Sequence, residues 1–120
     1  MLVKPLSIIA LIVTLFATVS TWAAMDSSGA VIQIPELDQA KVALNEKKYK
    51  LAIQLLTVAD QKVSNHADVM NLMGYSWRKI GKLKKAELFY KRALKISPQH
   101  LGALEYYGHL FVEIGQAGKA

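Results

Sequence analysis

Cysteine is absent from this 120-residue sequence, which excludes disulfide bonds and thiolate metal sites. The common motifs of nucleotide binding and metal-dependent hydrolysis are also missing, since neither GxGxxG, GxxxxGK[ST] nor HExxH occurs. No Ser/His/Asp set is suggested. The three histidines, His66, His100 and His109, are therefore expected to be solvated or helix-capping residues rather than metal ligands. We predict no enzymatic activity and no cofactor.

Acidic residues are fewer than basic ones, 9 against 15, which gives a net charge of +6. Many of the lysines form two groups: Lys47, Lys48 and Lys50, then Lys82, Lys84 and Lys85. No aromatic residues alternate with them in a way that would stack bases, so no nucleic-acid partner is predicted. The simpler interpretation is a solvated face, where the dipole at a helix C-terminus favours lysine. The alternative is a surface for acidic partners or anionic head groups.

The N-terminal segment has the layout of a secretory signal peptide. One basic residue, Lys4, precedes the uncharged apolar run LSIIALIVTLFATV, and small residues follow it up to Ala24. We predict a signal peptide over residues 1–23, a flexible linker over 24–35, and a periplasmic or secreted protein. The alternative is an uncleaved anchor in the inner membrane, facing the periplasm, because residues 6–24 are just long enough to cross a bilayer. A lipoprotein is disfavoured without cysteine.

The rest of the chain repeats itself with a period of 34 residues, which is typical of helical repeat proteins. The pairs include Gly74 and Gly108, Gly81 and Gly115, Met70 and Leu104, Trp77 and Phe111, and the series Ala52, Ala86 and Ala120. Within a period the apolar residues follow helical spacing. The pattern therefore predicts a helix-turn-helix hairpin in each period.

The clearest hairpin spans residues 67–100. Its first helix buries Met70, Met73, Trp77 and Ile80 and ends at Gly81. Its second helix begins near Leu83 and stops at Ser97-Pro98. The residues predicted to be buried on this second helix are Ala86, Phe89, Tyr90, Ala93, Leu94 and Ile96.

This segment resembles a tetratricopeptide repeat. The matching positions are Met70, Met73, Gly74, Trp77, Ala86, Tyr90, Ala93 and Pro98. Residues 33–66 resemble a degenerate copy and residues 101–120 a truncated third one. The resemblance implies an all-α domain over residues 36–120, in which antiparallel helix-turn-helix repeats stack as a short right-handed α-solenoid. We expect either a fragment of a longer array or a last repeat covered by another chain.

Tetratricopeptide arrays usually bind ligands on the concave face formed by the first helices. The resemblance places these residues there: Asp68, Asn71, Tyr75, Arg78 and Lys79, then Glu105, His109, Val112 and Glu113, with Leu37, Lys41, Leu44 and Asn45 from the first copy. It implies a non-catalytic protein–protein interaction module of the bacterial cell envelope, which binds a partner peptide or helix in its groove. The alternative is an assembly protein that self-associates through its open C-terminal repeat.

Overall fold

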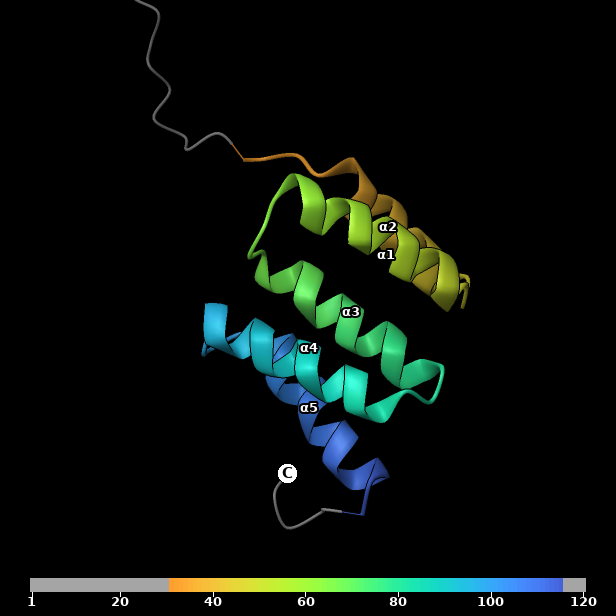
Figure 1. Cartoon of the computed structure of the whole chain (residues 1–120), viewed down its shortest axis with the longest axis vertical. Coiled ribbons are helices and arrows are strands. Elements are labelled where there is room, and N and C mark those ends of the chain that lie inside the picture. The colour runs from red at the N-terminus through yellow and green to blue at the C-terminus, as the bar shows by residue number, and fades with distance from the viewer. Residues whose placement is uncertain (1–30, 116–120) are drawn as a thin grey trace, which may run out of the picture. The chain divides into compact units, whose positions relative to one another are not determined.

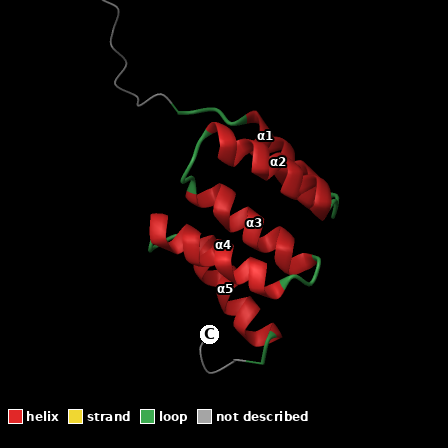
Figure 2. Ribbon diagram, in the orientation of Figure 1, coloured by secondary structure: helices red, strands yellow, loops and turns green. Residues whose placement is uncertain are grey.

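The computed structural model describes residues 31–115 (Figure 1). This range contains five helices, all of which belong to the compact unit formed by residues 32–120. They are α1 (Pro35–Asn45), α2 (Tyr49–Lys62), α3 (Ala67–Lys79), α4 (Leu83–Ile96) and α5 (Leu101–Glu113). No strand occurs in the described range (Figure 2), which confirms the all-α class. The predicted signal peptide, most of the linker and residues 116–120 lie outside it.

The helix bounds repeat with the 34-residue period found in the sequence. The bounds of α4 are those of α2 shifted by 34 residues, and the bounds of α5 are those of α3 shifted by the same amount. Each helix packs against the next along the chain, and α3 also contacts α5. The hairpins predicted over residues 33–66 and 67–100 are therefore present, as α1 with α2 and α3 with α4. Ile34, within the predicted linker, is buried in the core.

The turns inside the two hairpins have the same backbone geometry. Gly81 ends α3 with a φ of 82°, and the Lys82 amide donates to the carbonyl of Trp77 at 2.9 Å. Lys47 takes the same place after α1 with a φ of 58°, and the Lys48 amide donates to the carbonyl of Ala43 at 2.8 Å. This 6→1 bond with a left-handed residue is the Schellman ending of a helix. Glycine adopts that conformation more easily than lysine does.

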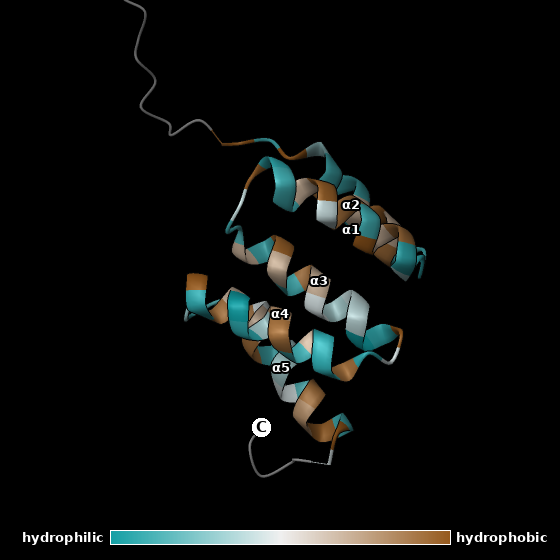
Figure 3. Ribbon diagram, viewed as in Figure 1, coloured by the Kyte–Doolittle hydropathy of each residue, from teal (hydrophilic) through white to brown (hydrophobic). Residues whose placement is uncertain are grey.

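Small residues bring the helices close together. Figure 3 shows hydrophobic and hydrophilic residues mixed along the helices. Tyr90 of α4 is fully buried, and a Cβ added to Gly74 of α3 would lie 2.6 Å from its ring. Met70 and Met73 are buried as predicted, and Trp77 is half-buried. The predicted burial of Ile96 is wrong, because this last residue of α4 is 38% exposed.

One face of α5 has little packed against it. Leu101 and Leu104 on this face are exposed. Val112, on a neighbouring face of α5, is exposed too. No described residue lies within 4 Å of a Cβ added to Gly108, the counterpart of Gly74. The α5 face, meaning Leu101, Leu104 and Gly108, is thus open within residues 31–115.

None of the helices within residues 31–115 combines the length and the hydropathy that a membrane-spanning segment requires.

The first turns of α2 and α4 carry lysine where the helix dipole disfavours it. Lys50 is the second residue of α2, and Lys84 and Lys85 follow the first residue of α4. Neither first turn contains an acidic residue, and neither N-cap residue makes a side-chain capping bond. The C-terminal dipole therefore cannot explain these three lysines, because they lie at the opposite, positive end of a helix.

We predict that Gly74→Ala destabilises the protein by about 1–3 kcal/mol, because the rigid Tyr90 ring cannot make room for the added methyl group. Gly108→Ala is the matched control, since it has the same place in α5 and open space around it. It should stabilise the protein by up to about 1 kcal/mol through helix propensity. Urea denaturation followed by circular dichroism measures both, and equal effects would contradict the packing argument.

Replacing Lys50 by glutamate should stabilise the protein by about 0.3–1 kcal/mol, because a carboxylate suits the N-terminus of α2. Gln61→Glu places a carboxylate at the other end of the same helix and should destabilise it by a similar amount. Thermal unfolding at low salt measures the difference. An unchanged or lowered melting temperature for Lys50→Glu would show that the dipole is not the dominant effect.

Candidate functional site

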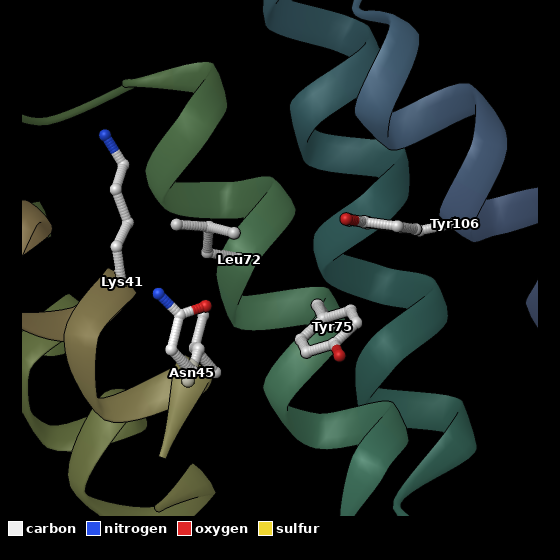
Figure 4. Close-up of a pocket in the computed structure, with 6 residues that line it drawn as sticks. Lys41, Asn45, Leu72, Tyr75 and Tyr106 are labelled. Carbon is white, nitrogen blue, oxygen red and sulfur yellow. The ribbon is translucent and has the colours of Figure 1, made fainter. Parts of the chain in front are cut away.

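A hollow of about 170 Å³ lies across α1, α3 and α5 (Figure 4). Its lining residues come from α1, α3 and α5: Lys41, Leu44 and Asn45, then Leu72 and Tyr75, then Tyr106. Lys41 and Asn45 are exposed, whereas Tyr75 and Tyr106 are half-buried. The hollow, called the tyrosine pocket below, therefore has polar groups on the α1 side and aromatic rings on the α3 and α5 side.

Two tyrosine rings line this pocket, and a third contacts one of them from outside the lining. The rings of Tyr75 and Tyr106 are 5.1 Å apart, and Tyr49 at the start of α2 lies 6.4 Å from Tyr75 in an edge-on arrangement. Ring pairs at such distances stabilise one another beyond the area they bury. The aromatic wall of the pocket is therefore held in place before any partner binds.

Two cationic groups contact the Tyr75 ring. The Arg78 guanidinium is 5.5 Å from the ring centre of Tyr75, and the Lys79 ammonium is also 5.5 Å from it. Arg78 is largely buried, with a side chain only 9% exposed, and forms an ion pair with Glu113 of α5. Arg78 thus links α3 to α5 and contacts the Tyr75 ring, while Lys79 is exposed to solvent.

Burial and hydrogen bonding shift three pKa values beneath the pocket. Burial lowers the pKa of Arg78, but Tyr90 and Glu113 beside it raise the pKa more. Burial raises the pKa of Tyr90 to about 12, although Arg78 acts in the opposite direction. Burial, together with a hydrogen bond to Glu87, raises the pKa of Tyr107 to about 12. Arg78 therefore stays charged and both phenols stay neutral at physiological pH.

The other residues predicted to line the groove are spread over the surface and the core. Asp68 accepts a hydrogen bond at 2.6 Å from His100, whose other ring nitrogen caps α5 by accepting from the Ala103 amide. Asn71 is buried, with its amide nitrogen close to Gly102 of α5.

Glu105 and His109 are exposed neighbours on α5, with 3.9 Å between Glu105 Oε1 and His109 Nε2. Of the eight residues predicted as the main site, only Tyr75 lines the pocket. Arg78 and Lys79 contact its ring, and Glu113 forms an ion pair with Arg78.

Sequence reasoning missed two residues of the tyrosine pocket, Leu72 and Tyr106. Both occupy the same place in their repeats, three residues before Tyr75 and His109 respectively. Residues three apart lie on the same face of a helix, so this spacing was a usable signal. The residues predicted from the first copy agree better with the pocket lining. Lys41, Leu44 and Asn45 line the pocket, whereas Leu37 is buried.

The tyrosine pocket is lined by aromatic rings, aliphatic groups, one ammonium group and one amide. No group of three potential metal ligands is found within residues 31–115. A larger hollow between α2 and α4 is lined by long polar side chains such as Arg92 and Lys95 and contains no aromatic ring. The tyrosine pocket is the better candidate, because rigid rings beside a few polar groups are what recognition sites commonly use.

The two raised phenol pKa values predict that stability falls as the pH rises from about 10 to about 12, because the unfolded chain loses these protons first. The slope of unfolding free energy against pH should be shallower for Tyr90→Phe than for the unchanged protein. Urea titrations at several alkaline pH values measure it. Parallel slopes for the two proteins would contradict the burial of the Tyr90 hydroxyl as the cause.

The chain was also compared with known proteins. A scan against models of protein families finds no match, and a search of curated proteins finds none either.

Proposed function

We propose that this protein is a non-catalytic interaction module that binds a peptide or helix of a partner protein across α1, α3 and α5. The tyrosine pocket is the observation that carries the proposal, since three helices contribute to it and its aromatic wall is held by Arg78 and Glu113. The proposal includes a stacked, tetratricopeptide-like arrangement of the hairpins and export to the bacterial cell envelope, with the periplasm as the place of action.

The chemistry of the pocket supports a protein partner. Tyrosine offers a large apolar ring and a hydroxyl group at little conformational cost, which is why it is common among binding hot spots. A volume of about 170 Å³ accommodates a single side chain rather than a cofactor-sized ligand. Lys41 and Asn45 at the α1 side can hydrogen-bond the backbone or a carboxylate of the bound segment.

A second candidate function is self-association through the α5 face. Leu101 is 80% exposed and Leu104 48% exposed, and both belong to the same face as the uncovered Gly108. Burying such residues against a second copy would be favourable. Light scattering at micromolar concentration separates the two functions, because an interaction module of the proposed kind remains monomeric until its partner is added.

Tyr75→Ala should weaken partner binding at least about tenfold, as expected for an aromatic hot spot. Affinity capture from envelope extracts with the tagged protein identifies the partner, and titration then measures the loss. Because Tyr75 also packs against other rings, Lys41→Glu provides a second test through an exposed lining residue. Leu88→Ala, exposed on α4 and outside the pocket, is the control. Unchanged binding by both pocket variants, with unchanged helical content, would exclude this site.

A further inference from the structure

The turns inside the two hairpins place six exposed lysines at one end of the helices. We call them the basic corner: Lys47, Lys48, Lys50, Lys82, Lys84 and Lys85. The two turns are neighbours, because residues 47–51 and Ile80 at the end of α3 line one shallow hollow. Figure 1 shows both turns at the same end of their helices. Lysines from separate repeats therefore present a common positive surface.

Acidic residues neutralise little of this charge. Lys48 pairs with Glu46 at 2.7 Å, and the Lys85 ammonium lies 4.2 Å from the ring centre of Trp77. The remaining four lysines, Lys47, Lys50, Lys82 and Lys84, have no ion pair with any residue between 31 and 115. Their ammonium groups are thus available to an external anion.

The backbone adds positive charge to the same surface. The N-termini of α2 and α4 point to the corner, and neither has a capping side chain or an acidic first turn. Lysines beside uncapped helix N-termini repel the helix dipole and reduce stability. Such an arrangement is repeated in both hairpins, so a contribution to folding does not account for it.

Apolar side chains lie among the lysines. Leu51 is 43% exposed and shares the shallow hollow with Lys47 and Lys50. A second hollow at the corner is formed by residues 81–85, and Leu83 lines it between Lys82 and Lys84. Aliphatic groups surrounded by lysines suit the boundary between lipid head groups and acyl chains.

We propose that the basic corner binds the phosphate head groups of an anionic lipid membrane. The lysines are spread over two turns at the ends of helices, which suits a flat anionic surface better than an extended acidic peptide. The corner contains lysine but no arginine, and therefore lacks the planar groups that pair carboxylates bidentately. The apolar run of residues 6–24 also brings the chain to a bilayer, whether it is removed or retained.

The tyrosine pocket and the basic corner use different residues. The pocket lining contains only one lysine, Lys41, which does not belong to the corner. A chain bound to a membrane through the corner could therefore still bind a protein partner. The lipid proposal stands or falls independently of the proposed protein partner.

The test compares two variants of the full chain with equal loss of positive charge. The corner variant carries Lys47→Gln, Lys50→Gln, Lys82→Gln and Lys84→Gln. The control variant carries Lys62→Gln, Lys91→Gln, Arg92→Gln and Lys95→Gln, all in the C-terminal halves of the same two helices. Flotation with vesicles of phosphatidylcholine alone, or mixed with phosphatidylglycerol, measures binding. Pure phosphatidylcholine reports what the N-terminal apolar residues contribute.

We expect phosphatidylglycerol to increase binding of the unchanged chain, and higher salt to remove the increase. The corner variant should lose at least about tenfold of the phosphatidylglycerol-dependent affinity, and the control variant much less. Equal losses in the two variants would mean that net charge alone acts, and would overturn the proposal. So would no preference for phosphatidylglycerol, or tighter binding to polyglutamate than to the anionic vesicles. Circular dichroism verifies that the corner variant is folded.

Discussion

The contact between Gly74 and Tyr90 is the constraint on which the rest of the structure depends. The ring of Tyr90 occupies the space that a side chain at Gly74 would fill, so α3 and α4 approach closely. Tyr107 of α5 stacks on that ring at 6.0 Å, and Arg78 lies beside it. One buried ring thus fixes α4 against α3 and places α5 next to both. The position of Tyr106 relative to Tyr75 follows from this packing.

In the described part of the chain, no such contact is present at Gly108, the residue that corresponds to Gly74 one 34-residue period later. No described residue occupies the space above it, and the neighbouring Leu104 is exposed. A glycine inside a helix is destabilising unless another group approaches it closely. Among residues 31–115, Gly108 therefore has no counterpart of the Tyr90 ring that packs on Gly74.

The 34-residue period predicted the two hairpins, because glycine and proline mark the helix ends of residues 67–100 and small residues recur in both copies. Prediction was poorer where the outcome depends on how two helices meet. Asn71 has the spacing of a surface residue, yet the approach of α5 at Gly102 buries it. Tyr106 looks like a neighbour of the core residue Tyr107, but the packing of α5 on α3 turns it towards Tyr75. The spacing of residues in the sequence predicts which face of a helix they occupy, but it does not predict the angle at which two helices pack.

The lysines show the limit of reading charge from sequence alone. As a pattern of basic residues near a turn, they suggested the favourable end of a helix dipole. The helix bounds reverse that interpretation for Lys50, Lys84 and Lys85, which lie at the positive ends of α2 and α4. Natural proteins commonly retain destabilising arrangements at sites that bind a ligand, because stability above a threshold brings no further advantage. The repeated cost at two turns is therefore better explained by what the surface binds than by how the chain folds.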